Sequence, residues 1–461
     1  MWFVGRSFCR RTKTFDTKGS GLYGPAAVKR DDGSSRSGSR GPGPRRPQNA
    51  GFTRRAAPGS VGVRVGDYRL PPDVATRVRA GHPWVFRDAL GPRGVSEPTG
   101  AVVDLISGNR EFVGRAYVDR EHQIALRVLT RRADERVIPG NGIVAARFAR
   151  AVQLRWILFG ANRPQAMRMF SGETEGLPGV TVDRYGDFVV VQWLSAGALA
   201  WRDELYDAIQ EALKPAGLYE QKRLKPLGGQ GAPEPATRVR GEEAPLELVV
   251  EDSGCRFGID VTAPLGVGLF PDMRLGWAAV AKRAADRRVL NLFSYTGAFS
   301  VHAAKAGARE VVNVDLAAKA NARARRNFEL SGLDPGKLEA HAADSTKAVE
   351  KMASRGRRFD IVICDPPTFS HGPAGQFSVA RDLGALAATC LSVLDPGGLL
   401  VFATNSTKVS PPDFDRALGE GAAMAGADLR VIERVSMPPD YPVAPGFPEG
   451  NYLKLAICLR A

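Results

Sequence analysis

From Arg287 to the C-terminus, the chain alternates between short apolar runs and segments with helical periodicity. Continuous apolar runs are typical of strands that are buried on both faces of a parallel sheet. The last two runs, "LRVIERV" and "YLKLAICLR", have no helix between them, so we expect an antiparallel hairpin at one edge of the sheet. The pattern predicts an α/β fold with a Rossmann-like C-terminal domain. The expected helices span residues 297–306, 316–331, 345–354, 379–394 and 413–425.

Two smaller units are expected upstream of this domain. Runs such as "FVGRAYV" and "QIALRVLT" are punctuated by Gly, Pro and Asp, which predicts a small β-barrel. A helix over 143–160 and a hairpin around "YGD" then begin a small α/β unit, in which 225–245 is expected to be a flexible loop. The expected segments are a disordered basic tail (1–60), the β domain (61–135), the central α/β domain (140–262) and the C-terminal domain (263–461).

The net charge of +15 is unevenly distributed along the chain. The first 60 residues contain 13 Lys and Arg against 3 Asp and Glu, so they carry +10, and they are rich in Gly, Pro and Ser. Such a segment cannot bury enough apolar surface to fold, and we expect a solvated tail. An RNA-contacting arm or a transit peptide has a similar composition. The other 401 residues carry only +5, which is compatible with a nucleic-acid partner.

Composition also bears on the compartment. The five cysteines are scattered without a CxxC pair, and no two histidines stand four residues apart, so we expect neither a disulfide framework nor a metal site. No uninterrupted apolar run reaches about 18 residues, so no membrane span is expected. These features predict a cytoplasmic protein.

Polar residues follow the ends of four predicted parallel strands, and this is the edge at which α/β sheets bind ligands. The first strand ends in the turn "NLFSYTGAFS", in which Gly297 opens a helix, and the next three end at Asp315, Asp344 and Asp365. Acids at these positions can accept hydrogen bonds from ribose hydroxyls and an adenine amino group, although each alone could cap a helix. The turn lacks GxGxxG and a lysine, so it suits a nucleoside without phosphate, such as S-adenosylmethionine.

Several longer segments extend this interpretation. "GHPWVF", "EGLPGVTVDRYGDF", "VGLFPDMR", "VLNLFSYTGAFSVHA", "VDLA", "CDPPTF" and "FPEGNYLK" resemble the class I S-adenosylmethionine-dependent methyltransferases of 23S ribosomal RNA. The resemblance covers about residues 65–461 and is strongest to the type with a PUA domain, a small α/β domain and a catalytic domain. It implies an RNA-binding PUA domain and a large-subunit rRNA, or its assembly intermediate, as partner. It also implies a cofactor pocket lined by Asp272, Arg274, Phe293, Ser294, Tyr295, Thr296, Gly297, Asp315, Asp344 and Asp365.

The identity of the methylated atom depends on residue 405. The most similar relatives make 5-methylcytosine, which requires a cysteine nucleophile, but Asn405 in "GGLLVFATNSTK" stands at the position of that cysteine. "DPPTFS" with "ATNS" also resembles a branch that methylates guanine N7, whose lone pair needs no activation. We therefore expect guanine N7, with cytosine C5, an exocyclic amine or a catalytically silent assembly factor as alternatives. The expected active-site residues are Asp365, Pro366, Pro367, Phe369 and Asn405.

Overall fold

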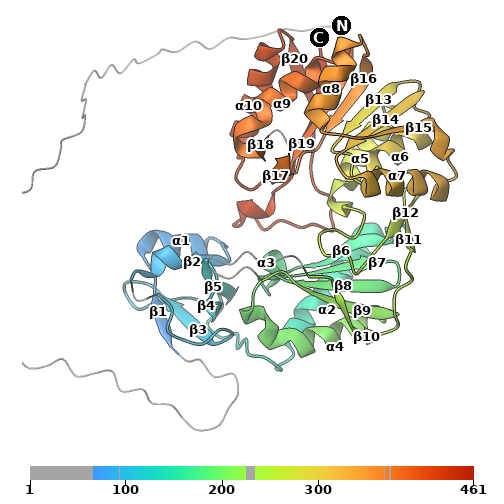
Figure 1. The fold of residues 1–461 in the computed structure, drawn as a ribbon. Helices are drawn as coiled ribbons and strands as arrows, with labels where there is room; N and C mark the ends of the chain where they lie inside the picture. Colours follow the sequence, from blue (N-terminus) through green and yellow to red (C-terminus); the bar gives the residue numbers. More distant parts are fainter. Residues whose placement is uncertain (1–65, 93, 225–233, 368, 373–374) are drawn as a thin grey trace, which may run out of the picture. The chain divides into compact units, whose positions relative to one another are not determined.

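The computed structural model describes residues 66–92, 94–224, 234–367, 369–372 and 375–461 (Figure 1). Within these ranges the C-terminal part forms a seven-stranded sheet in the order β15-β14-β13-β16-β19-β21-β20. The first five strands in this order are parallel, and β21 is antiparallel to both β19 and β20. The predicted α/β fold and terminal hairpin are therefore confirmed. The strands are β13 Arg288–Leu292, β14 Glu310–Asp315, β15 Leu338–Ala342, β16 Phe359–Cys364, β19 Leu394–Thr404, β20 Leu429–Val435 and β21 Lys454–Arg460.

Helices cover both faces of this sheet, and alternate residues of each strand point to opposite faces. In β16, Ile361 and Ile363 belong to one buried cluster, whereas Val362 and Cys364 belong to the other. The first cluster includes residues of α5, α6 and α7, and the second includes residues of α8, α9 and α10. The helices are α5 Arg274–Ala281, α6 Ala298–Lys305, α7 Ala318–Leu330, α8 Ser345–Ser354, α9 Val379–Leu391 and α10 Pro411–Met424.

The first described sheet has the order β1-β3-β4-β5-β2. A helix, α1 Pro72–Arg79, accompanies these strands and was not expected from the sequence. Its apolar face consists of Val74, Ala75 and Val78, which pack in the same core as the strands. The strands are β1 Asp67–Arg69, β2 Trp84–Phe86, β3 Val102–Ile106, β4 Phe112–Val118 and β5 Ile124–Thr130.

A second five-stranded sheet, in the order β10-β9-β8-β7-β6, forms the centre of the chain. Buried residues of α2 Ile143–Phe159 and α4 Arg202–Leu213 share a core with this sheet. The prediction of a loop over 225–245 was wrong for β10, which is an edge strand of mostly exposed residues held by backbone pairing with β9. The strands are β6 Ala166–Ser171, β7 Val180–Tyr185, β8 Phe188–Trp193, β9 Gly217–Lys222 and β10 Thr237–Gly241.

Two short hairpins lie outside these three sheets. β11 Leu248–Asp252 pairs with β12 Cys255–Ile259, and β17 Phe369–Gly372 pairs with β18 Gly375–Ser378. The predicted tail over 1–60 lies outside the described residues, and the proposed domain boundaries stay a prediction. Among the described residues, no helix combines the length and the apolar character needed to cross a membrane.

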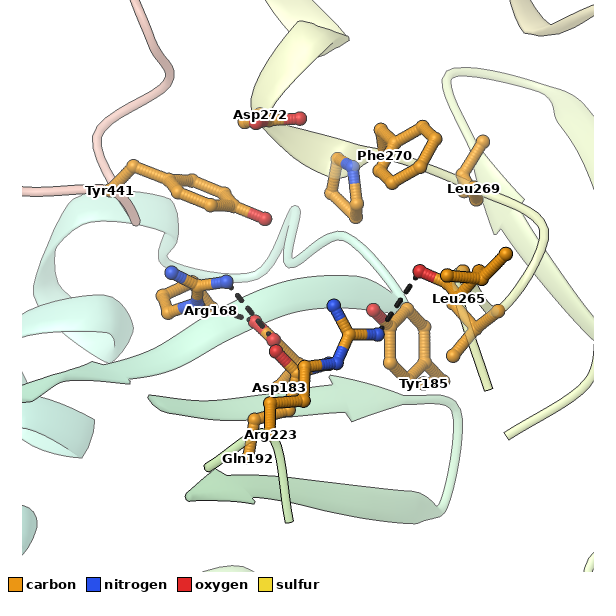
Figure 2. A pocket seen from close by; sticks show the side chains of 13 residues that line it. Arg168, Asp183, Tyr185, Gln192, Arg223, Leu265, Leu269, Phe270, Asp272 and Tyr441 are labelled. Atoms are coloured by element: carbon orange, nitrogen blue, oxygen red, sulfur yellow. Dashed lines mark hydrogen bonds and ion pairs between the residues drawn. The ribbon is translucent and has the colours of Figure 1, made fainter. Parts of the chain in front are cut away.

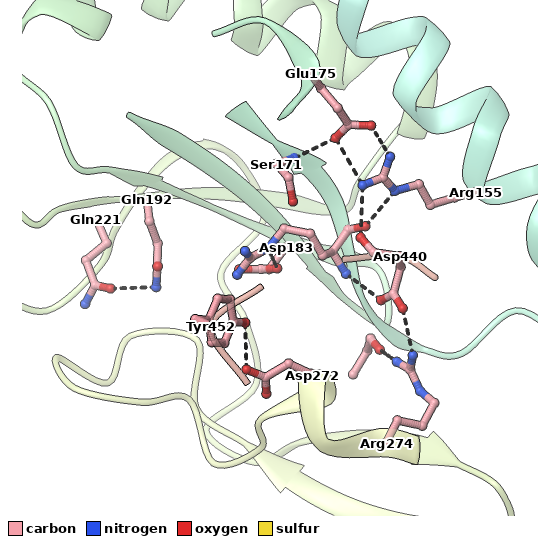
Figure 3. Close-up of polar contacts among 12 residues, drawn as sticks. Arg155, Ser171, Glu175, Asp183, Gln192, Gln221, Asp272, Arg274, Asp440 and Tyr452 are labelled. Atoms are coloured by element: carbon pink, nitrogen blue, oxygen red, sulfur yellow. Dashed lines mark hydrogen bonds and ion pairs between the residues drawn. The ribbon is translucent and has the colours of Figure 1, made fainter. Parts of the chain in front are cut away.

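A buried ion-pair network joins the central sheet to the C-terminal part (Figure 3). Arg274, at the start of α5, donates from Nε to Asp252 at 2.5 Å and from Nη1 to Asp440 at 2.9 Å. The other carboxylate oxygen of Asp440 accepts from the backbone N of Arg168 at 3.0 Å. The Asp440 carbonyl accepts from Arg155 Nη2, also at 3.0 Å. Elements that are distant in sequence therefore share one buried carboxylate.

We expect the substitution Asp440→Ala to lower the free energy of unfolding by about 3 kcal/mol, because it leaves part of the Arg274 charge buried without its partner. Urea unfolding would measure this loss. The matched control is Asp428→Ala, which removes an exposed carboxylate 2.7 Å from Arg430 and is expected to cost at most about 1 kcal/mol. Equal effects of the two substitutions would contradict a stabilising role for the buried network.

Candidate active site

The turn between β13 and α6 has an unusual backbone. Phe293 and Tyr295 have positive φ values of 52° and 47°, and Gly297 has a φ of 78°. The turn is closed by a hydrogen bond from the N of Gly297 to the Ser294 carbonyl at 2.9 Å. Non-glycine residues in this conformation are strained, and such strain is concentrated at functional sites. The Ser294 hydroxyl is buried without a hydrogen-bond partner among the described residues, so this turn offers a polar atom to a ligand.

Asp315 supports this turn from the end of β14. Its Oδ2 accepts from the backbone N of Tyr295 at 2.8 Å, and its Oδ1 accepts from the N of Ala317 at 2.9 Å. The carboxylate is only half-buried, because Asp315 ends the strand. Leu316 follows it with 58 % of its surface exposed, an apolar side chain at the strand tip that the sequence analysis did not single out.

Asp344 follows β15 and caps α8, since its Oδ1 accepts from the N of Lys347 at 3.1 Å. This is the capping role that any single acid at such a position can have. The next residue, Ser345, accepts from the N of Phe293 at 3.4 Å and so connects α8 to the turn. The structure therefore brings Asp344 to the same sheet edge as the turn and Asp315.

The charge of Asp272, in the short helical turn Pro271–Met273, acts on Asp365 at the end of β16. Burial, and then the charge of Asp272, raise the pKa of Asp365 to about 7. Burial also raises the pKa of Asp272, although the hydrogen bond that it accepts from the Tyr452 hydroxyl at 2.8 Å opposes this. Tyr452 was not among the expected site residues, because nothing local marks a tyrosine 180 positions away as a partner. The charge of Arg168 also lowers the pKa of Asp272. A cation near Asp365 would favour its ionised form.

Asn405 follows β19, which pairs with β16 so that Phe402 lies opposite Cys364. The two strands are parallel, and β19 continues two residues beyond this pair to Thr404, so Asn405 follows at the same edge of the sheet as Asp365 and the two prolines. Asn405 is exposed, Pro366 is buried and Pro367 is exposed. Phe369 opens β17, and its side chain lies outside what the structure describes.

Three predicted cofactor residues have contacts within the protein. All three guanidinium nitrogens of Arg274 donate within the protein, to Asp252, Asp440 and the Ala166 carbonyl. A Cβ on Gly297 would lie 2.9 Å from the Cβ of Ala324, so this glycine allows α7 to pack against the turn. Similarly, Thr296 donates to the Gly268 carbonyl at 2.7 Å. Direct cofactor contacts by these residues stay a prediction.

Residues of the central sheet also line a cavity of about 110 Å³ beside Asp272 (Figure 2). Arg168 and Asp183 lie opposite each other in β6 and β7 and form a bidentate ion pair, with contacts of 2.6 and 3.1 Å. The Arg168 guanidinium lies 4.7 Å from the ring centre of Tyr441. Sequence analysis missed these residues because opposite charges on neighbouring strands are common in any sheet.

Comparison with known proteins identifies the family. Residues 209–450 match the family described as S-adenosylmethionine-dependent methyltransferase, which is more than half of the chain. The chain belongs to this methyltransferase family. Residues 69–131 match a PUA-like domain, so the first described sheet belongs to a PUA-like module.

This methyltransferase matches relatives over nearly their full length. The ribosomal RNA large subunit methyltransferase I of Tolumonas auensis is 32% identical over 374 residues, which are 81% of this chain and 94% of the relative. The protein of the same name from Shewanella denitrificans is 30% identical over 387 residues, or 84% and 97%. The crystal structure of SMU.776 in complex with SAH has the same fold, with a TM-score of 0.76 and 24% identity over 86% of this chain and 100% of that one.

The geometry of the strand tips fits S-adenosylmethionine. The buried Ser294 hydroxyl lies in the strained turn and the carboxylate of Asp315 supports it, and both can bind polar groups of a nucleoside. The exposed side chain of Leu316 offers an apolar surface next to Asp315. The Asp272–Asp365 pair suits the positive charge of the cofactor, which supplies the methyl group.

The raised pKa of Asp365 predicts a pH-dependent preference between cofactor and product. A nearby cation favours the ionised carboxylate, and the fraction of ionised Asp365 increases as the pH rises through about 7. S-adenosylmethionine carries a sulfonium charge that S-adenosylhomocysteine lacks. We therefore expect the affinity ratio of the two ligands to increase by up to about tenfold between pH 6 and pH 8. Calorimetry at several pH values would measure it.

The control for this measurement is Asp365→Asn, which keeps the shape of the side chain but removes its titration. The ratio of affinities should then change much less over the same pH range. A wild-type ratio that is constant between pH 6 and pH 8 would mean that the Asp365 carboxylate does not face the sulfonium.

Proposed function

We propose that this methyltransferase modifies a base of large-subunit ribosomal RNA. The main support for this proposal is the Asp365-Pro366-Pro367 segment at the end of β16. β16 pairs with β13, the strand that precedes the turn assigned to the cofactor. The PUA-like module supports an RNA substrate, because a small-molecule methyltransferase does not need it. The named relatives, which this chain matches over 94% and 97% of their lengths, support the large subunit.

We propose guanine N7 as the atom that receives the methyl group. Methylation of cytosine C5 needs an accessible thiolate, but all four described cysteines are buried. Burial raises the pKa of Cys255 to about 11 and that of Cys458 to about 12, and the pKa of Cys364 well above its usual value. Cys390 packs in the same core cluster as Cys364, and Cys9 lies outside the described residues. Asn405, at the end of β19, has no nucleophilic group.

The residues at this tip have distinct proposed roles. Asp365 accepts hydrogen bonds from an amino group of the base, and the two prolines stiffen the loop that carries it. Asn405 can both donate to and accept from the base edge, because its amide has both kinds of group. Phe369 stacks on the ring of the flipped base. Guanine N7 carries no proton, so positioning of the base suffices and no general base is needed.

We expect Asp365→Ala to reduce the turnover of rRNA methylation by about a hundredfold or more, because it removes the group that orients the base. The dissociation constant of S-adenosylmethionine should change by less than about tenfold. Single-turnover kinetics and calorimetry would measure the two effects. Asp315→Ala is the matched variant, and it should weaken cofactor binding because it removes the carboxylate that supports the turn. A loss of cofactor binding in Asp365→Ala that equals the loss of turnover would refute the proposed role.

Nucleoside analysis identifies the base. Purified protein and labelled S-adenosylmethionine are incubated with rRNA from a strain that lacks the protein, and the digested RNA is analysed by mass spectrometry. We expect the label in 7-methylguanosine. Label in 5-methylcytidine would refute the choice of guanine and require a thiolate that becomes exposed during the reaction. An absence of transfer together with an absence of cofactor binding would favour a catalytically silent RNA-binding protein.

A further inference from the structure

A second and larger cavity, of about 580 Å³, lies apart from the strand tips. Its wall is built by the end of β5, by α2 and by the short helix α3 Gly172–Glu175, together with Pro442. None of the residues that we assign to cofactor binding or catalysis lines it. Four arginines do so: Arg131, Arg132, Arg147 and Arg150.

Arg131 and Arg147 are held in place by backbone carbonyls. Arg131 donates from Nε to the carbonyl of Val78 at 2.5 Å and from Nη2 to that of His82 at 3.0 Å. Burial lowers the pKa of Arg131, and among the described residues it forms no ion pair. Arg147 donates to the Gly176 carbonyl at 2.5 Å. Arg147 also forms an ion pair with Glu135 at 2.9 Å. Among the described residues Arg131 is fixed by neutral carbonyls, so it keeps its positive charge available for an anion.

The positive charges in this cavity exceed the negative ones. Glu175, the only acid that lines it among the described residues, is engaged by Arg155 and by the backbone N of Ser171. Burial lowers the pKa of Arg147, and the neighbouring charge of Arg150 lowers it further, although Glu135 opposes both. Arg147 and Arg150 stand three residues apart on α2, so their side chains lie on one face of the helix.

The lining between the arginines is apolar. Leu129, Ala151, Leu154 and Pro442 contribute to it, and Leu154 keeps 39 % of its surface exposed. An apolar surface surrounded by guanidinium groups fits a nucleotide, because a base can pack on the apolar part while the phosphate binds Arg. A free phosphate would gain nothing from the apolar part.

We propose that this arginine cavity binds the phosphate backbone of a single-stranded RNA segment next to the target nucleotide. The inference rests on the proposed function for the choice of RNA. Pro442 lines this cavity, whereas its neighbour Tyr441 lines the cavity beside Asp272, so one loop borders both. Thr174 fixes that loop by donating to the Pro442 carbonyl at 3.1 Å. A strand that follows the loop has its phosphates at the arginines and its target base near Asp365.

The test compares two double variants that remove the same amount of charge. R132Q/R150Q removes two of the three exposed arginines of the cavity and leaves Arg131 and Arg147, which donate to backbone carbonyls, unchanged. R430Q/R434Q removes two arginines of β20, which lie outside the cavity and pair with Asp428 and Asp415. Arg132 and Arg430 are well matched, because their side chains are 70% and 67% exposed and each pairs with an acid two residues away.

Binding of an rRNA fragment is measured at several salt concentrations for each protein. For R132Q/R150Q we expect the dissociation constant for the RNA to rise at least about tenfold. We also expect the magnitude of the slope of log affinity against log salt to fall by about 1.4, because each phosphate that the variant no longer neutralises contributes about 0.7. For R430Q/R434Q we expect no change in slope. In methylation assays, KM for RNA should rise in the first variant while kcat and the affinity for S-adenosylmethionine stay at the wild-type values.

Two results separate this inference from the proposed function. If the wild-type protein methylates rRNA and R132Q/R150Q binds RNA with the wild-type affinity and slope, the arginine cavity is not an RNA site. The same conclusion follows if both double variants lose affinity equally. If the wild-type protein neither binds nor methylates rRNA, the proposed function fails and this inference fails with it.

Discussion

Arg274 lies between two carboxylates, Asp252 and Asp440, where little solvent reaches it. A buried charge is stable only when it is paired and fully hydrogen-bonded, so α5, the β11–β12 hairpin and the loop before β21 must come together at this residue. This ion pair also influences the candidate active site, because Arg274 belongs to the segment "FPDMR". Its Arg274 is fixed in the interior, and Asp272, two residues earlier, belongs to the short helical turn that faces Tyr452 and Asp365. The position of one acidic group of the site thus depends on this ion pair.

The loop that supplies Asp440 also connects the other parts of the described chain. Its Phe447 packs against Trp84 of the PUA-like module with ring centres 4.6 Å apart, and Glu449 lies 3.2 Å from His82. Tyr441 lies over Arg168 of the central sheet. The "GHPWVF" motif therefore connects the PUA-like module to the C-terminal part, and the half-buried Trp84 packs against Phe447. We therefore place the proposed RNA contacts on other side chains, such as those of the arginine cavity.

The sequence predicted the parts of this molecule that local periodicity determines. The parallel sheet and its helices follow from buried apolar runs, and the acids at the strand tips follow from the order of those runs. Contacts between distant residues were not predictable, because the pair of Arg168 with Asp183, or the bond from Tyr452 to Asp272, leaves no local pattern. β10 was missed for a related reason: an exposed edge strand is held by backbone hydrogen bonds and needs no apolar residues. Arg274 differs from these residues, because it belongs to a motif that predicted a contact with the cofactor. In the structure it makes its hydrogen bonds within the protein.

The acidic pair at the tip bears on the choice between guanine and cytosine. Burial and the charge of Asp272 disfavour the ionised form of Asp365, and a positive charge near Asp365 opposes this effect, as Arg168 does at Asp272. Methylation at guanine N7 moves the positive charge from the sulfonium to the base, because no proton leaves the ring. Methylation of cytosine C5 ends with a neutral nucleobase, because the ring loses a proton. This reaction also needs a thiolate nucleophile and a general base that removes the proton. Two carboxylates beside an uncharged amide such as Asn405 can stabilise a charge that stays in the site, which is the requirement of the guanine reaction.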